Sequence, residues 1–205
     1  MSSSPRQIAG LTLIELMITL TIMSILLAIA VPSFSALRQR AALRGAADQV
    51  LSVWNLARFE AVKRNQMVKV GIVTGASGAF CVGAATTTDA ADSTPCDCMS
   101  AAPASNVCDV ARYPDDQSDW KKVSLVGVTI GGTTSLSSTQ PVIIEPKRTS
   151  LTDPMDKGTI SLAGPSGPNF YKLNMAIDQL GHGVLCESTT AASKLPEYSS
   201  RRCAD

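Results

Sequence analysis

The sequence has little charge, few aromatic residues and a single histidine. Charged residues make up 17% of the 205 residues, and aromatic residues make up 4%. The 18 Lys and Arg side chains stand against 17 Asp and Glu side chains. The chain as a whole therefore has no surplus of one sign that would draw it onto nucleic acid or an anionic membrane.

Catalytic and metal-binding patterns are also scarce. The one histidine, His182, stands between two glycines, as is typical of a turn. No nucleophile motif surrounds it, and no metal-ligand spacing includes it. Asp115, Asp116 and Asp119 offer oxygen ligands for calcium, but a solvated acidic turn is the more common reason for such a cluster. We therefore expect a protein that is not an enzyme and that holds neither a cofactor nor a metal.

The six cysteines take their meaning from the compartment in which the chain folds. A length of 205 residues suffices for one modest hydrophobic core, so we expect a single globular domain in addition to any N-terminal anchor. In an exported domain, an even number of cysteines predicts disulfides. In a cytosolic domain, the same number indicates metal or redox chemistry.

The N-terminus indicates export with a retained anchor. Residues 1–10 are short and polar, and Arg6 is their only ionisable side chain. Residues 11–31 are apolar and carry one charge, so as a helix they match the hydrocarbon core of about 30 Å. The small residue Gly10 precedes this stretch, so cleavage after it leaves the hydrophobic segment on the mature protein. The positive leader predicts a cytoplasmic N-terminus.

Glu15 is the one charge inside the predicted span. A carboxylate in a membrane costs several kcal/mol unless it is paired, so it indicates a function. After cleavage it lies one helical turn from the new α-amino group of Leu11, and the amine of a neighbouring subunit can neutralise it at low dielectric. The alternative is a glutamate that reaches the membrane interface from near the end of the helix.

Residues 10–17 read GLTLIELM and resemble the class III signal of type IV prepilins. The resemblance implies that a prepilin peptidase cuts after Gly10, that Leu11 is then N-methylated, and that Glu15 registers incoming subunits in a filament. The family most often has Phe where Leu11 stands. Pro32 matches the helix-kinking proline of the family. It removes a helix donor, so residues 24–31 are expected to bend or unwind inside a filament.

Beyond Pro32 the spacing of apolar residues predicts that the helix continues to about Asn65. Its core stripe is predicted to consist of Phe34, Leu37, Ala41, Ala47, Val50, Leu51, Trp54, Ala57 and Ala61. Arg44 with Asp48 and Glu60 with Arg64 are expected i,i+4 pairs on other faces.

The rest of the chain predicts a sheet. Strands are expected at residues 67–74, 122–130, 141–146, 158–163, 169–177 and 183–186, with glycine and proline turns between them. Residues 84–119 lack periodicity and are expected to form a long loop that is either a decorated surface loop or partly mobile. One long helix followed by a run of strands predicts an α+β fold with an antiparallel sheet.

A second resemblance narrows the family. Residues 55–65 read NLARFEAVKRN and are similar to the helix end of the FimT, FimU and GspH group of minor pilins and pseudopilins. Trp120 and residues 180–186 fall where that group has a tryptophan and a C-terminal strand. The resemblance implies the type IV pilin fold, in which a long N-terminal helix packs on an antiparallel sheet. It also implies a disulfide between Cys186 and Cys203, which contributes roughly 3 kcal/mol in the chain-entropy model.

The other four cysteines leave alternatives open. A bridge between Cys96 and Cys98 would close a strained small ring, so we expect two bridges that join these residues separately to Cys81 and Cys108. The sequence does not decide which pairs with which. A four-thiolate zinc site is the competing hypothesis, although the Cys-x-Cys spacing is not that of common zinc ribbons.

DNA binding is a further hypothesis. Some FimT proteins bind DNA through a C-terminal Gly-Arg-x-Arg motif, but the matching residues 181–184 of this chain contain no arginine. Lys194, Arg201 and Arg202 are the candidate replacements, and three nearby acids at positions 187, 197 and 205 dilute their charge. We therefore favour a structural role over DNA contact.

The sequence thus predicts a minor pilin. Residues 1–10 form a leader peptide, residues 11–31 a transmembrane and filament-core helix, and residues 32–205 the amphipathic helix and a periplasmic sheet domain. The expected partners are the prepilin peptidase, the bacterial inner membrane, and other major and minor pilins in an extracellular pilus. A DNA-binding competence pilin and a minor pseudopilin of type II secretion, in a periplasmic pseudopilus, are the alternatives.

Overall fold

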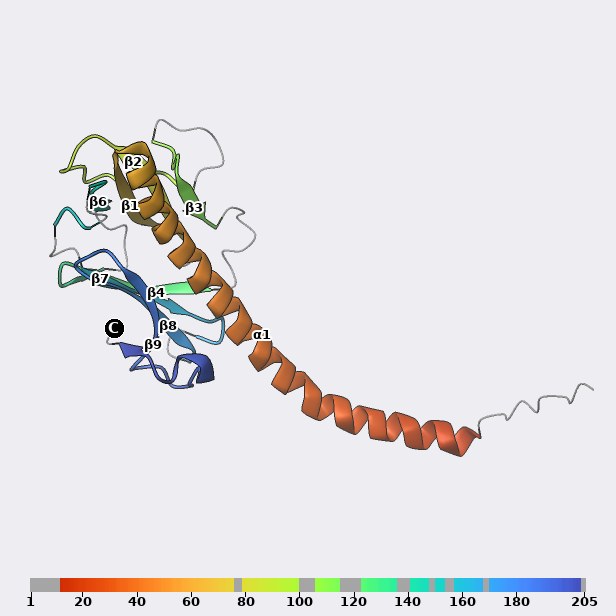
Figure 1. Ribbon diagram of the computed structural model, residues 1–205. Helices are drawn as coiled ribbons and strands as arrows, with labels where there is room; N and C mark the ends of the chain where they lie inside the picture. The colour runs from red at the N-terminus through yellow and green to blue at the C-terminus, as the bar shows by residue number, and fades with distance from the viewer. Residues whose placement is uncertain are drawn as a thin grey trace, which may run out of the picture. The chain divides into compact units, whose positions relative to one another are not determined.

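The computed structural model describes residues 12–75, 79–99, 106–114, 123–135, 141–147, 150–153, 157–167 and 170–203. Six residues singled out in the sequence lie outside these ranges: Gly10, Leu11, Asp115, Asp116, Asp119 and Trp120. The chain divides into two compact units, Met1–Arg38 and Gln39–Asp205. The second unit contains the sheets and the part of the helix that packs on them (Figure 1).

The long helix α1 runs from Leu13 to Arg64, which confirms the predicted end near Asn65. Asn65 has a φ of 51°, the left-handed conformation with which helices often end. The next amide, that of Gln66, bonds back to the carbonyl of Ala61 at 3.2 Å. The helix continues without a break through residues 24–31 and past Pro32. Bending or unwinding of that stretch in a filament stays a prediction.

The buried face of α1 begins later than the sequence predicted. Its buried apolar residues are Leu43, Ala46, Ala47, Val50, Val53, Trp54, Ala57 and Ala61. The predicted core positions Phe34 and Leu37 are wrong, because each is 61% exposed, and Ala41 is exposed as well. These side chains are therefore not part of the core that the described residues form.

The four-stranded sheet has the order β3-β2-β1-β6. Strand β1, Met67–Thr74, confirms the predicted strand and pairs along its whole length with β2, Phe80–Thr87. The edge strands are β3, Ala111–Tyr113, and β6, Val142–Ile144. The prediction of a loop over residues 84–119 is therefore wrong in part, because half of β2 and all of β3 lie inside it. Residues 80–85 are all buried, so β2 lacks the alternation of a half-exposed strand.

The six-stranded sheet has the order β10-β9-β8-β7-β4-β5. Its members are β4 (Ser124–Ile130), β5 (Thr133–Ser135), β7 (Gly158–Ala163), β8 (Lys172–Ile177), β9 (Gly183–Ser188) and β10 (Arg202–Cys203). Four of them confirm predicted strands, and β5 and β10 were missed. All pairs are antiparallel except β10 with β9, where Arg202 aligns with Glu187. The architecture is α+β, as predicted.

One hydrophobic cluster joins the helix to both sheets. Trp54 is the largest of its fully buried side chains, and Val50, Ile144, Leu162 and Leu173 pack in the same cluster. Burying side chains of this size contributes about 1.5–3 kcal/mol each. The core therefore fixes residues 43–61 of α1 against the sheets, and the opposite face of this helix segment lies on the surface.

Candidate functional site

The N-terminal part of α1 presents an uninterrupted apolar surface. Twelve large apolar side chains between Leu13 and Ile29 are 52–77% exposed. The helix is long and apolar enough to cross a membrane, judged by length and composition, and none of its most apolar stretch is buried. Such a surface needs an apolar environment, which a bilayer or a bundle of like helices provides.

Polar side chains within this stretch are satisfied by their own helix. The hydroxyls of Thr19, Thr21 and Ser24 donate to the carbonyls of Leu16, Met17 and Thr21 at 2.9, 2.5 and 2.8 Å. In lipid, an unbonded hydroxyl would cost several kcal/mol. These three groups therefore do not oppose insertion.

Glu15 forms a capping box with Thr12 at the start of the helix. The amide of Thr12 donates to Glu15 Oε2, and the amide of Glu15 donates to Thr12 Oγ1, both at 3.3 Å. The Thr12 hydroxyl also donates to Glu15 Oε2 at 3.3 Å. This reciprocal pattern satisfies free amides at a helix N-terminus. A carboxylate in the first turn is also favoured by the helix dipole.

The capping box was not predicted, although its signal was visible as the spacing Thr-x-x-Glu at residues 12–15. It means that the subunit itself holds the Glu15 carboxylate in part. If Glu15 pairs with the α-amino group of a neighbouring subunit, as the sequence predicts, that group would compete with Thr12 or add to its contacts. The predicted cleavage residues, Gly10 and Leu11, lie outside the described residues, so their positions relative to Glu15 are not part of this geometry.

The C-terminal segment is fastened to β9 by a disulfide and a buried carboxylate. Cys186 and Cys203 are joined, with their Cα atoms 5.8 Å apart. Glu187 is 1% exposed, and its Oε1 accepts the amide of Leu195 at 2.5 Å. Its Oε2 lies 3.7 Å from Arg202 Nε. The loop between the two cysteines is thus held at both ends and in its middle.

One of the three cations predicted as possible DNA contacts lies beside an acid of its own fold. Lys194, Arg201 and Arg202 are all exposed, but Arg202 faces the buried carboxylate of Glu187. On the helix, Arg44 pairs with Glu197 of the same C-terminal loop at 2.7 Å, where the sequence predicted Asp48 as its partner. The acid beside Arg202 weakens the attraction of that cation for phosphate.

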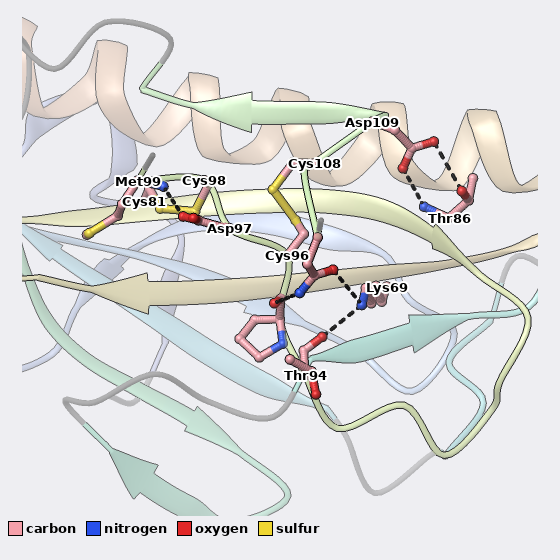
Figure 2. Close-up of a disulfide and its surroundings, with 12 residues drawn as sticks. Lys69, Cys81, Thr86, Thr94, Cys96, Asp97, Cys98, Met99, Cys108 and Asp109 are labelled. Atoms are coloured by element: carbon pink, nitrogen blue, oxygen red, sulfur yellow. Dashed lines mark hydrogen bonds between the residues drawn. A yellow bond between two sulfur atoms is a disulfide. The ribbon is translucent and has the colours of Figure 1, made fainter. Parts of the chain in front are cut away.

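The remaining four cysteines form two bridges, Cys81–Cys98 and Cys96–Cys108. This is one of the two pairings that the sequence left open, and it leaves no thiolates for the zinc site considered above. Figure 2 shows both bridges beside the four-stranded sheet. Within the part of the chain that the structure describes, no group of three His, Cys, Asp or Glu side chains is arranged to hold a metal.

Residues 5–31 match the family model of the prokaryotic N-terminal methylation motif. The match confirms the prepilin-type signal deduced from residues 10–17. The chain thus combines this motif with a long, apolar N-terminal helix and a helix-on-sheet architecture.

No curated protein matches the chain in sequence. Among solved structures, it is similar to the crystal structure of the type IV minor pilin FimU of Pseudomonas aeruginosa strain PAO1. The TM-score is 0.42 and the identity 14%, over 71% of this chain and 89% of that chain. The functional deduction below therefore rests on the N-terminal motif and on this chain's own geometry.

Proposed function

We propose that the chain is a minor pilin, a structural subunit that helps to assemble a type IV pilus. A prepilin peptidase removes residues 1–10, and residues 11–31 hold the subunit in the inner membrane before it joins the filament. Residues 32–205 carry the sheet domain on the periplasmic side and then on the filament surface. The observation that carries this proposal is the methylation motif on a helix whose apolar side chains the described chain leaves uncovered.

The transfer of the helix from the membrane to the filament determines which interaction Glu15 has to provide. Lipid tails are as apolar as Leu and Ile, so moving the helix from a bilayer into a helix bundle gains little from the hydrophobic effect. Registration of one subunit on the next then depends on close packing and on polar pairs. Glu15 is the one acid among residues 12–37, and its pairing with a neighbour's α-amino group is strong in a low-dielectric surrounding.

The decisive experiment replaces Glu15 in the full chain. Glu15→Val makes the span more apolar, so the variant inserts, but it lacks the acid that pairs between subunits. We expect normal membrane levels together with a loss of incorporation into sheared pili. Thr19→Val is the matched control, because it also removes a polar group from the span and leaves Glu15 in place. Incorporation of Glu15→Val at the level of Thr19→Val would contradict the proposal.

A minor pseudopilin of a type II secretion system is the second candidate, because the methylation motif does not distinguish a pilus subunit from a pseudopilus subunit. Deletion of the gene distinguishes the two. A pilus subunit is needed for surface pili and twitching, whereas a pseudopilin is needed for secretion of exoproteins. Intact piliation together with lost secretion would replace the pilus proposal with the pseudopilus.

A further inference from the structure

One face of the four-stranded sheet packs on α1, and the other face is covered by a segment that we call the cap, defined as residues 88–99 and 106–110. Side chains of a strand alternate between the two faces. Val68, Val70 and Ile72 of β1 belong to the core cluster with the helix. Lys69 and Gly71, between them, meet the cap, since a Cβ on Gly71 would lie 2.6 Å from Pro95.

The two bridges of the cap have different topological roles. Cys81–Cys98 joins strand β2 to the cap, whereas Cys96–Cys108 joins the two halves of the cap to each other. The halves also meet through the amide of Asp97, which donates to the carbonyl of Asn106 at 2.7 Å. Apart from the peptide chain, which joins the ends of the cap to β2 and β3, only the first bridge ties the cap covalently to the sheet.

The bridges also differ in exposure. Cys81 and Cys98 are 0% and 3% exposed, so both partners of the tying bridge are buried. Cys108 and Cys203, one partner in each of the other two disulfides, are only partly buried. Beneath the cap, Gly83 lacks a side chain where the sulfurs of Cys96 and Cys108 lie, and no other residue would fit there without displacing them.

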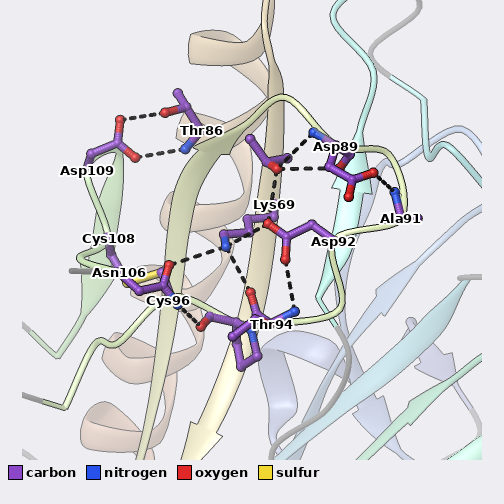
Figure 3. A network of polar contacts seen from close by, with 12 residues as sticks. Lys69, Thr86, Asp89, Ala91, Asp92, Thr94, Cys96, Asn106, Cys108 and Asp109 are labelled. Atoms are coloured by element: carbon purple, nitrogen blue, oxygen red, sulfur yellow. Dashed lines mark hydrogen bonds and ion pairs between the residues drawn. A yellow bond between two sulfur atoms is a disulfide. The ribbon is translucent and has the colours of Figure 1, made fainter. Parts of the chain in front are cut away.

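Lys69 is the polar centre under the cap. Its side chain is 7% exposed, and its Nζ donates to Asp92 Oδ2 at 2.9 Å, to the carbonyl of Thr94 at 2.9 Å and to Asn106 Oδ1 at 3.3 Å (Figure 3). An ammonium has three donors, so all of them are used. The hydrogen bond from Lys69 is the largest of the causes that lower the pKa of Asp92, which keeps that carboxyl ionised.

All three acceptors of Lys69 belong to the cap. The neighbours of Lys69 in the sheet, Ala85 and Ile143, have apolar side chains. If the cap left the sheet, the ammonium would lose every partner and return to water. If the cap were seated without Lys69, Asp92 would be a half-buried charge without its cation. Burial of Lys69 and seating of the cap are therefore one event.

We propose that the cap is an oxidation-dependent closure, in which formation of Cys81–Cys98 seats the cap on the sheet, buries Lys69 and then shields its own disulfide from reductants. In each bridge, two thiols give up two electrons and two protons to a disulfide-exchange oxidant, which leaves as a dithiol. Such oxidants act after export. The cap is thus open on the reduced chain. It closes in the oxidising compartment and stays closed while the protein functions.

The first test measures acylation of lysines by an N-hydroxysuccinimide ester in the full oxidised chain in detergent, with peptide mass spectrometry. Lys63, whose side chain is 61% exposed, is the internal reference. We expect Lys69 to react at least about tenfold more slowly than Lys63, as for a group that reacts only through local opening. In the double variant Cys81→Ser with Cys98→Ser, the rate for Lys69 should rise to that of Lys63.

The matched control removes the bridge between β9 and β10 with Cys186→Ser and Cys203→Ser, and Lys69 should stay protected there. Protection of Lys69 in the Cys81→Ser, Cys98→Ser variant would overturn the proposal, because hydrogen bonds alone would then seat the cap. Loss of the helical circular dichroism signal in that variant would also overturn it, because the cap would not be a separate unit.

A second measurement uses the unaltered protein and does not depend on a folded variant. Under native conditions a phosphine reductant is added in steps, and free thiols are alkylated and assigned by mass spectrometry. We expect Cys186 with Cys203, and Cys96 with Cys108, to be alkylated before Cys81 and Cys98. Alkylation of Cys81 and Cys98 first, or together with the others, would contradict a self-shielding closure.

Discussion

The indole nitrogen of Trp54 donates a hydrogen bond of 2.8 Å to the backbone carbonyl of Gly181, and both residues are buried. The bond joins α1 to the turn between β8 and β9. The Asp178 side chain shapes that turn, because its Oδ1 accepts the amides of Leu180 at 2.9 Å and His182 at 2.7 Å. Gly181 has a φ of 75°, which suits glycine. The helix thus bonds to a turn whose conformation is fixed by Asp178, independently of the helix.

The first prediction concerns this hydrogen bond. Trp54→Phe keeps an aromatic ring in the core and removes the donor, so the Gly181 carbonyl is left buried without its partner. We expect the free energy of unfolding to fall by about 1–3 kcal/mol, measured by urea denaturation of the full chain in a mild detergent. Phe59→Leu is the control, because Phe59 is 60% exposed and such a change stays within about 0.5 kcal/mol. Equal losses in the two variants would refute the assignment.

The helix, strand β1 and most of the six-stranded sheet could be predicted because their sequence signals are local. The 3.6-residue spacing of apolar side chains marks α1, and branched residues between turns mark β1, β7 and β8. Strand β2 was missed because its two faces are both buried, one by α1 and one by the cap, so small residues replace alternation. The partners of Lys69 lie 23, 25 and 37 residues away. Their meeting depends on disulfides whose pairing the sequence left open.

The candidate site likewise has features that the sequence indicates and contacts that it does not. Glu15 could be singled out because a charge in an apolar span stands out in the sequence, and its role in assembly stays a prediction. The contact between Arg202 and Glu187 could not, because it needs the parallel pairing of β10 with β9 that the Cys186–Cys203 bridge permits. Phe34 and Leu37 show the opposite error. Spacing alone marks a helix face as apolar, but it does not say whether a sheet or another molecule covers that face.

The second prediction concerns pH. Glu60 is 7% exposed, and its carboxylate accepts from Lys63 Nζ at 2.9 Å and from Arg64 Nε at 2.6 Å. Hydrogen bonds from Lys63 and then Arg64 lower the pKa of Glu60 below its ordinary 4.5. A carboxyl with a lowered folded-state pKa stabilises the protein above its unfolded-state pKa, and this stability is lost as pH falls through the folded-state pKa.

The thermal midpoint of the wild type should therefore fall more steeply below about pH 4.5 than that of Glu60→Gln. The variant has no carboxylate at this position, so it has no such stabilisation to lose. At pH 7 the variant should be the less stable of the two. Glu197→Gln is the control, since Glu197 is more than half exposed and pairs at the surface with Arg44. Parallel melting profiles for the wild type and Glu60→Gln across this range would show that the pair with Lys63 and Arg64 does not stabilise the fold.

The third prediction concerns processing. The match of residues 5–31 to the methylation motif leads us to expect a mature chain that begins with N-methylated Leu11. Intact mass spectrometry of the purified protein should give residues 11–205 plus one methyl group. Gly10→Val should leave the precursor uncut, and Ala9→Val, one residue earlier in the leader, should be cut. A mature N-terminus beyond Val31 would indicate a conventional signal peptide and would exclude a pilin.

The last prediction separates assembly from DNA capture. Removing the leader with Arg6 leaves 17 Lys and Arg against 17 Asp and Glu, so the mature chain has no surplus of cations. We expect little retardation of duplex DNA by the full chain in detergent at physiological salt. At low salt, Arg201→Ala should weaken the residual binding and make its salt dependence shallower, because each phosphate contact releases counterions.

Arg202→Ala is the matched comparison at the neighbouring position. Arg202 lies against the buried carboxylate of Glu187, and part of its charge is therefore already balanced within the fold. Its replacement should reduce DNA binding less than Arg201→Ala, while it lowers thermal stability more because Glu187 then loses its cation. Equal effects on binding would show that the ion pair leaves Arg202 available to phosphate. Tight, salt-sensitive binding by the unaltered chain at physiological salt would make DNA capture the leading function in place of assembly.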